Sequence, residues 1–423
     1  MKFDKPINEN YSATIVRVPA IVPLKGRDFI VGVPVHGYQA IVQKDNWSVG
    51  DLGVFLPAEA QLSEDFAARN NLHKHSDRND DPTEVGYLED NRRIKAIKFA
   101  GHRSDAMLLP LKSVAYTGID VSELREGDTF DTIGDHEICR KYEIATKAEK
   151  ALNEKNKGRT FSRVDRKHFH THVDTSNYFR VRDQISADTE IIVSAKYHGT
   201  SWRGANTIVA RELPWRDRIA KRLGVRVQET GYDHVFGSRR VLKDVNNPRQ
   251  QHFYAKDIWS EFGSKLGQIL PEGFIVFGEL VGYTSDGAEI QKDYHYGLPQ
   301  GTHELFVYRV AQINPQGRLT DLSWDQVVEF ARDHGLNTVP VLWRGKHSDF
   351  DVDQFLDVRF RDLGYETLSL GPDKTLVDEG VVIRVEGLVP FLAKAKSPRF
   401  FAHETRVLDE GVADLESTEA VAA

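Results

Sequence analysis

The chain has 423 residues, of which 40% are hydrophobic and 28% charged, an ordinary composition for a globular protein. This length exceeds what one hydrophobic core usually serves, so we expect two domains. No run of eighteen apolar residues exists, which argues against a membrane span, and the single cysteine, Cys139, excludes a disulfide within the chain. The N-terminus lacks an apolar leader, and we expect a monomeric protein of the cytoplasm.

The formal net charge of −7 conceals an uneven distribution of cations. Lys and Arg concentrate in residues 140–182 and again from Arg203 to Lys243, whereas acidic side chains are in excess after Glu404. The densest cationic run comprises Arg216, Arg218, Lys221, Arg222 and Arg226. Such a run is either a solvated helix face or a contact for a polyanion, and the pattern alone does not separate the two.

Short β-like runs separated by turn residues occupy the N-terminal third of the chain, among them ATIVRV, FIVGVPV, YQAIVQ, LGVFLP and MLLPL. This spacing predicts a small barrel or sandwich, which we assign to residues 1–135. The polar segment Leu62–Asp90 is predicted to be a long loop or insertion. Residues 136–164, which include the helix-like ATKAEKALNEKNKG, are predicted to link two domains.

A second, larger domain is predicted for residues 165–405. Its strand-like runs are EIIVSAKY, FIVFGELVGY, ELFVYRVAQI and EGVVIRVEGL. Helical patterns lie between them, such as WDQVVEFARDHG, for which Ser323 and Asp325 are candidate N-terminal caps. Residues 406–423 are predicted to form a disordered acidic tail.

Lys196 stands at the end of one of these strands, three residues before Gly199. The same Lys-x-x-Gly spacing also occurs at Lys98, Lys155 and Lys221, so the spacing alone identifies nothing. What distinguishes Lys196 is the order of the segments that follow it. These are Phe277-Gly278-Glu279, Phe306-Val307-Tyr308, Asp378-Glu379-Gly380-Val381-Val382-Ile383-Arg384 and Ala393-Lys394-Ala395-Lys396-Ser397.

These segments contain the groups that a phosphoryl-transfer site needs. The carboxylates of Glu279 and Glu379, each at a strand, suit a hydrated Mg²⁺ ion. Lys394 and Lys396 alternate along a strand, which places both amines on one face, where they suit a polyphosphate. Taken singly, each residue has an ordinary structural explanation, and it is the ordered set that favours a site.

The ordered set KYHGTS, FGEL, FVYRV, EGVVIR and KAKS resembles motifs I, III, IIIa, IV and V of the covalent nucleotidyltransferases, and KYHGTS is most similar to the RNA ligase 2 family. The resemblance covers about residues 165–401. It implies an α+β fold in which antiparallel sheets flanked by helices form a ligase-type adenylyltransferase domain, unrelated to the ATP-grasp fold. The implied function is an ATP-dependent RNA ligase that uses Mg²⁺ or Mn²⁺ and joins 3′-OH and 5′-phosphate ends through lysyl-AMP and adenylylated RNA.

The resemblance also implies a role for each matching residue. Lys196 would be the nucleophile, and its amine would need a depressed pKa, for which Lys394 and Lys396 are candidate causes. Tyr308 would stack on adenine, Glu279 would bind ribose or a metal-bound water, and Glu379 would hold the metal. Lys396 and Lys394 would neutralise the α-phosphate. The remaining candidates are Gly199 in motif I, Arg203 and Arg239 for ribose or phosphate, and His198 for the metal.

Three positions depart from the family pattern. Ala195 stands where many relatives have a glutamate, which puts one adenine contact in doubt. His198 replaces the aspartate of DNA ligases, and Ser201 stands where RNA ligase 2 proteins have asparagine. Separately, His168, His170 and His172 alternate on one strand face, but without cysteine or a fourth ligand the pattern favours exposed or RNA-facing histidines over zinc.

The front domain resembles the OB domain that precedes the transferase in a branch of nick-sealing RNA ligases, with Trp47, Gly50 and Asp51 fitting that pattern. Its candidate RNA-facing cations are Arg92, Arg93, Lys95, Lys98 and Arg103. DNA ligases and capping enzymes place a barrel after motif V, and only 27 residues follow Lys396. The alternatives that stay open are a DNA ligase of unusual domain order and a non-catalytic RNA-binding protein with a degenerate transferase fold.

Overall fold

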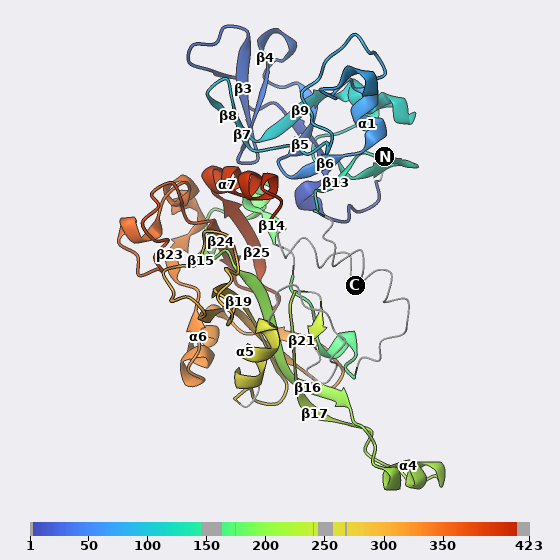
Figure 1. Cartoon of the computed structure of the whole chain (residues 1–423), viewed down its shortest axis with the longest axis vertical. Helices are drawn as coiled ribbons and strands as arrows, with labels where there is room; N and C mark the ends of the chain where they lie inside the picture. The colour runs from blue at the N-terminus through green and yellow to red at the C-terminus, as the bar shows by residue number, and fades with distance from the viewer. Residues whose placement is uncertain are drawn as a thin grey trace.

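The computed structural model describes residues 3–144, 163–173, 175–239, 241–243, 257–266 and 269–412. It has two domains stacked along the long axis, with the N-terminal domain at one end and the larger C-terminal domain below it (Figure 1). The predicted helix-like stretch ATKAEKALNEKNKG lies outside the described residues. None of the described helices is long and apolar enough to cross a bilayer.

The N-terminal domain is built on a seven-stranded sheet whose strand order is β10-β1-β5-β9-β4-β3-β2. Its strands are β1 (Ala13–Arg17), β2 (Val22–Pro23), β3 (Ile30–Val35), β4 (Tyr38–Gln43), β5 (Leu52–Pro57), β9 (Ala106–Pro110) and β10 (Thr129–Phe130). Smaller hairpins add β7 (Ile97–Phe99), β8 (His102–Ser104), β11 (Thr132–Ile133) and β12 (His136–Glu137). Apolar side chains alternate inward along these strands and form two buried clusters, one on each side of β5.

One internal segment and the C-terminal limit of this domain differ from the prediction. The segment Leu62–Asp90 contains helix α1 (Glu64–Arg69), which Ser63 caps, and Phe66 and Leu88 are buried in the domain core. The domain also extends past residue 135, because β13 (Cys139–Lys141) pairs with β6 (Ala60–Leu62). The thiol of Cys139 is buried there. The polar composition of Leu62–Asp90 predicts a loop, but the segment is folded because its few apolar side chains contact strands distant in sequence.

The C-terminal domain contains two sheets. One has the order β14-β25-β24-β15-β23 and the other β18-β17-β16-β19-β20-β21. The first comprises β14 (Ser176–Asn177), β15 (Glu190–Lys196), β23 (Val341–Lys346), β24 (Gly380–Val385) and β25 (Phe391–Lys396). The second comprises β16 (Thr200–Ala210), β17 (Thr230–Gly237), β18 (Leu242–Lys243), β19 (Phe274–Gly282), β20 (His303–Ile313) and β21 (Leu319–Asp321), with β22 (Asn337–Thr338) beside β20.

Four described α-helices accompany these sheets in addition to the short α3 (Tyr178–Val181): α4 (Trp215–Arg222), α5 (Ile258–Leu266), α6 (Trp324–Asp333) and α7 (Pro398–Asp409). Of the two predicted caps, Ser323 caps α6 through a capping box with Gln326, whereas Asp325 lies in the first turn of the helix. One apolar cluster joins the two sheets and contains the buried rings of Trp202 and Trp259. The expected α+β architecture is confirmed.

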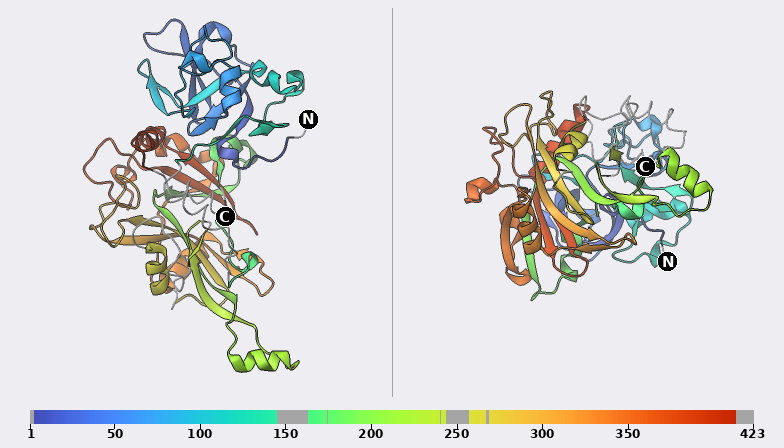
Figure 2. Two further views of the ribbon diagram at one scale, coloured as in Figure 1. Left: turned by 45° about the vertical axis from the view of Figure 1, so that its right-hand side comes forward. Right: turned by 90° about the horizontal axis from the view of Figure 1, so that it is seen from below.

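Helix α7 lies between the two domains in both side views (Figures 1 and 2). Phe401 of α7 stacks on Tyr38 of β4, with ring centroids 5.0 Å apart, and is buried in the N-terminal core. The hydroxyl of Thr405 donates to Oε1 of Glu59 at 2.7 Å, and Arg93 contacts Asp409 at 2.5 Å. Helix α7 therefore continues to Asp409, past residue 406 where the sequence placed a disordered tail, because it has a domain on either side to pack against. Residues 413–423 lie outside the described part.

Candidate functional site

The register of three neighbouring strands brings the candidate lysines together. Lys196 ends β15 and has Gly380 of β24 as its Cα partner, and Gly380 in turn has Lys396 of β25. The two lysines thus flank a position without a side chain. Gly380 has a φ of 142°, and a Cβ built there would lie 2.0 Å from the carbonyl oxygen of Ala395, so no other residue fits.

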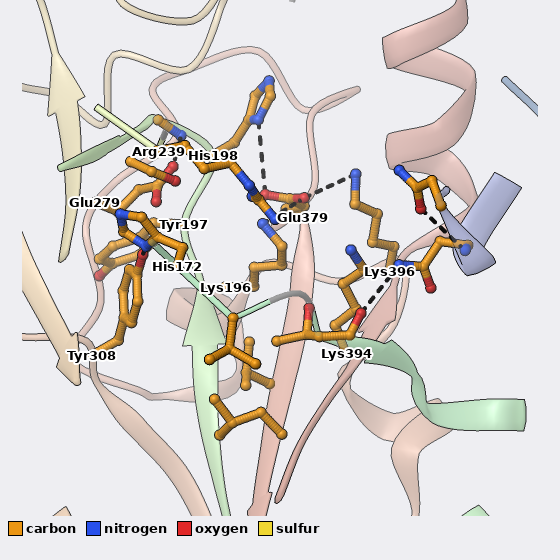
Figure 3. Close-up of a pocket in the computed structure, with 18 of the residues that line it drawn as sticks. His172, Lys196, Tyr197, His198, Arg239, Glu279, Tyr308, Glu379, Lys394 and Lys396 are labelled. Carbon is orange, nitrogen blue, oxygen red and sulfur yellow. Dashed lines mark hydrogen bonds and ion pairs between the residues drawn. The ribbon is translucent and has the colours of Figure 1, made fainter. Parts of the chain in front are cut away.

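Glu379 precedes this glycine and lies between the two amines (Figure 3). Its Oε1 is 2.9 Å from Nζ of Lys196 and 3.1 Å from Nζ of Lys396. Its Oε2 is 3.8 Å from Nδ1 of His198. On the far side of Lys396, Oε1 of Glu404 on α7 lies 2.9 Å from the same Nζ. Cations and carboxylates therefore alternate across the strand ends.

The charges of this cluster stabilise one another despite burial. Burial alone raises the pKa of Glu379, but the cations of Lys196, Lys396 and His198 outweigh it and bring the pKa down to about 2. Burial lowers the pKa of Lys396, but Glu404 and Glu379 outweigh it and raise that pKa well above its ordinary value. At neutral pH Glu379 is a carboxylate and Lys396 an ammonium ion.

The loop after Lys196 is held against β19. The backbone N–H of Gly199 donates to Oε1 of Glu279 at 3.2 Å, and the side chain of Gln291 donates to the carbonyl of Gly199 at 2.7 Å. The N–H of His198 donates to the hydroxyl of Tyr296 at 2.6 Å. A Cβ on Gly199 would lie 2.2 Å from the carbonyl oxygen of Leu280, so the close approach requires glycine.

These groups surround a cavity of about 510 Å³ that both domains line. Nine of the ten predicted site residues lie on its wall: Lys196, His198, Gly199, Arg239, Glu279, Tyr308, Glu379, Lys394 and Lys396. The N-terminal domain contributes Asn8, Asn10, Tyr11, Arg140 and Lys141, among others. A volume of this size lies within the range of small-molecule and cofactor sites.

Arg203 is the exception among the predicted site residues. It does not line the cavity, and its guanidinium donates to the carbonyls of Ser238, Phe169 and His170 while it lies over the ring of Phe169. The family resemblance implied a ribose or phosphate contact for Arg203. In the fold, Arg203 lies opposite Phe277 of β19, and its N–H groups are directed to backbone carbonyls instead of the cavity.

Several residues at the site were not singled out by the sequence. His172 lines the cavity, and its Nδ1 lies 2.6 Å from the hydroxyl of Tyr308. Glu404 lines it from α7, and Gln291 from the connection between β19 and β20. Glutamate on a helix face and glutamine in a loop give no sequence signal, whereas His172 stood within a recognisable histidine run.

The histidine run does not form a metal cluster. His168 bonds the carbonyl of Pro315, and His170 bonds that of Gly317. His168 is buried, so the expectation that these histidines are exposed is wrong for it. Among the described residues no three His, Cys, Asp or Glu side chains form a preformed metal cage.

A divalent cation held by few protein ligands nevertheless fits the cavity. Oε2 of Glu379 is buried and finds no hydrogen-bond partner among the described residues. Glu279 lines the same cavity. Mg²⁺ keeps several waters and is usually held by one or two carboxylates together with substrate phosphates, so Glu379 with Glu279 is a sufficient donor set.

Four of the five predicted RNA-facing cations of the N-terminal domain form ion pairs within the protein. Arg93 is buried between Glu59 and Asp409, Arg92 pairs with Glu64, Lys95 with Glu89 and Asp409, and Arg103 with Asp105. Only Lys98 among the five is exposed without an ion pair in the described part of the chain. The expectation of an RNA-facing side chain is wrong for the buried Arg93, and for the other four it stays a prediction.

Comparison with known families identifies the two domains that line this cavity. Residues 189–399 match the RNA ligase family model, and residues 12–111 match an OB-fold domain model. The chain belongs to the RNA ligase family. The resemblance predicted from the motif order is thereby confirmed, together with the OB domain in front of the transferase. No curated protein matches the sequence.

Solved structures of the RNA ligase of Naegleria gruberi share the fold. A variant with ATP and manganese aligns with a TM-score of 0.60 at 15% identity, covering 92% of this chain and 98% of that chain. The Naegleria enzyme with pyrophosphate aligns with a TM-score of 0.56 at 17% identity over 93% and 98%. A variant with AMP and manganese aligns with a TM-score of 0.58 at 16% identity over 92% and 98%. Both domains are included in these matches, so the domain order is shared.

Proposed function

We propose that this RNA ligase uses ATP to join RNA 3′-OH and 5′-phosphate ends through a lysyl-AMP and a 5′-adenylylated RNA. The observation that carries the proposal is the position of the Lys196 amine, 2.9 Å from a buried carboxylate and facing a cavity in a domain of the RNA ligase family. The Naegleria structures contain ATP, AMP or pyrophosphate, several with manganese, which supports ATP and a divalent cation as cofactors here.

In the first reaction Lys196, an ammonium ion in its pair with Glu379, gives up one proton to solvent and attacks the α-phosphorus of ATP as the neutral amine. The N–P bond forms, the bond from the α-phosphorus to the bridging oxygen breaks, and pyrophosphate leaves. Glu379, with a pKa near 2, is too weak a base to retain the amine's proton, so it orients the lysine while the proton passes to solvent in the cavity. A divalent cation bound by Glu379 and Glu279 would offset the phosphate charge.

The second and third reactions reuse the same groups. The RNA 5′-phosphate oxygen attacks the phosphorus of lysyl-AMP, which forms a 5′–5′ pyrophosphate linkage and releases Lys196. The RNA 3′-OH then attacks the 5′-phosphate, forms the phosphodiester and expels AMP. Lys396 and Lys394, on one face of β25, would offset the charge that develops on phosphate oxygens.

The base-binding end of the cavity is assigned to Tyr308. The hydrogen bond between the Tyr308 hydroxyl and Nδ1 of His172 fixes the orientation of this ring, and His172 itself packs against Phe277 with centroids 5.0 Å apart. A ring fixed in this way gives adenine a planar surface on which to stack. Arg239 is assigned to a phosphate or ribose, because it lines the cavity beside Glu279.

The decisive experiment is incubation with ATP labelled at the α-phosphate. We expect wild type to form a labelled covalent adduct and Lys196→Ala to form none while keeping its thermal unfolding profile. Lys98→Ala, at another Lys-x-x-Gly, is the matched control and should be labelled normally. Labelling of Lys196→Ala would overturn the assignment of the nucleophile.

A second measurement identifies the polynucleotide. Matched nicks with RNA or DNA on the 3′-OH side are sealed in parallel, and we expect preference for RNA. Equal sealing of all-DNA nicks would instead support a DNA ligase with this domain order. Because every assigned group comes from one chain, we also propose that the monomer is active. Measuring ligase activity in the fractions of a size-exclusion column tests this, and the activity should follow the monomer peak.

A further inference from the structure

An extended arm leads away from the site. Strand β16 begins at Thr200, next to the loop that holds the nucleophile, and runs to Ala210, where it is paired with Thr230 of β17. Residues 211–229, which we call the arm, connect these two ends and contain α4. In Figures 1 and 2 α4 stands at the tip of this hairpin, clear of the remaining elements.

Helix α4 buries none of its residues. An isolated helix of two turns is only marginally stable in water unless one face packs against something. We therefore expect α4 to pack against a binding partner. Trp215, Ile219 and Leu223 follow one another at intervals of four residues, and they are 66%, 49% and 77% exposed. An apolar stripe thus faces solvent along the whole helix.

The charge around this stripe is positive. The arm carries six Lys and Arg against three Asp and Glu, in a chain whose net charge is −7. Arg216 lies beside the stripe on one side, over the ring of Trp215, and Arg222 falls on the other side by helical spacing. Neither forms an ion pair within the described part of the chain, whereas Lys221 pairs with Glu229.

The length of β16 is comparable with one turn of a nucleic-acid duplex. Its ten residue steps span about 33 Å between the loop after Lys196 and the start of the arm, and one turn of a duplex is on the order of 30 Å. The minor groove of A-form RNA is wide and shallow and is recognised through sugars and phosphates. A helix with an apolar stripe flanked by arginines is complementary to such a surface.

We propose that the arm binds the sugar–phosphate backbone of the RNA substrate about one helical turn from the break, with Arg216 and Arg222 on phosphates and the Trp215 stripe against riboses. The inference rests on the proposed function, since it assumes that RNA reaches Lys196. It adds a second contact with RNA, distant from the reacting atoms. Because of this contact, the enzyme should bind nicked duplexes with long flanks more tightly than those with short flanks.

Two variants test the arm. In the first, Asn-Gly replaces residues 211–229, since Ala210 and Thr230 are already paired and a two-residue turn joins such strands. The second is Arg216→Glu with Arg222→Glu. Its matched control is Arg332→Glu with Lys346→Glu, an equal charge change on exposed cations of α6 and β23.

Enzyme–AMP formation needs no RNA and should stay within about twofold of wild type in all variants, which also reports correct folding. With a nicked RNA duplex whose flanks exceed about one turn on each side, we expect both arm variants to bind on the order of 10-fold more weakly. The slope of log affinity against log salt should become shallower by about 2 for the double charge reversal, one unit per phosphate contact. Duplexes with flanks shorter than about half a turn should be sealed equally by all proteins.

Unchanged affinity and unchanged salt slope in both arm variants would overturn the proposal and leave the arm to a protein or membrane partner. Equal losses in the control variant would also overturn it, because the effect would then follow net charge rather than position. A wild type that forms no enzyme–AMP, or forms it but seals no RNA, would instead refute the proposed function.

Discussion

Gly199→Ala tests whether the loop after the nucleophile depends on a close backbone approach. A Cβ at this position would lie 2.2 Å from the carbonyl oxygen of Leu280 and 2.9 Å from side-chain atoms of Glu279 and Val281. To reach an ordinary contact the two segments must separate by about 1 Å, and overpacking of this kind costs about 1–3 kcal/mol. Strand β19 is paired on both sides, so the loop is the part that moves.

A shift of about 1 Å in a reacting group lowers rates by roughly 10²-fold, so we expect enzyme–AMP formation by Gly199→Ala to slow by that factor. Single-turnover labelling with ATP measures it. Gly231→Ala in β17 is the control, because its Cβ would meet only the flexible side chain of Arg211 at 3.3 Å. A Gly199→Ala protein that is adenylylated within about threefold of the wild-type rate would refute the steric argument.

Three further predictions concern the charges of the site and the domain contact. Glu379→Gln removes the carboxylate shared by Lys196 and Lys396, and we expect enzyme–AMP formation to fall by about 10²-fold or more, with circular dichroism showing a folded protein. Chelation of divalent cations should abolish adduct formation, and added Mg²⁺ or Mn²⁺ should restore it; an adduct that persists in chelator would contradict the metal assignment. Burial raises the pKa of Glu59 to about 7 although Arg93 opposes the shift. Because the folded-state pKa exceeds the ordinary 4.5, the associated stability is complete below about pH 4.5 and falls by about 3 kcal/mol as the pH rises through 7. Glu59→Gln should remove this dependence in thermal unfolding between about pH 5 and 8, and an unchanged pH profile would show that Glu59 is not its source.

The sequence predicted the chemistry of the site better than its surroundings. Lys196, Glu279, Glu379 and Lys396 were recognisable because a phosphoryl-transfer site needs these groups in a fixed order, and that order is preserved along the chain. Lys196 and Glu279 lie in strands that were visible as apolar runs, Glu379 directly precedes another, and the alternation of Lys394 and Lys396 predicted the strand that carries Lys396. Arg203 lies off the cavity wall because its guanidinium bonds the carbonyls of Phe169, His170 and Ser238, and no local pattern indicates such contacts between separate segments.

Domain limits were less predictable for the same reason. The segment around Phe66 has the composition of a loop, yet it is folded because its apolar side chains meet strands from elsewhere in the domain. Residues 406–409 adjoin an acidic C-terminal segment and were predicted to belong to it, yet they are helical because Thr405 and Asp409 contact Glu59 and Arg93, more than 300 residues earlier.

The sequence by itself determined that the chain has a nucleotidyltransferase motif set, that an OB domain precedes it and that Lys196 is the candidate nucleophile. Local composition and the order of short motifs carry that information, and neither depends on how the strands pair. The tertiary structure decided that Glu379 is shared between two lysines, that Glu404 and His172 join the site, that α7 connects it to the front domain and that the cationic run from Arg216 to Arg226 stands on an arm. Each of these is a contact or an exposure set by long-range packing, for which a linear pattern holds no signal.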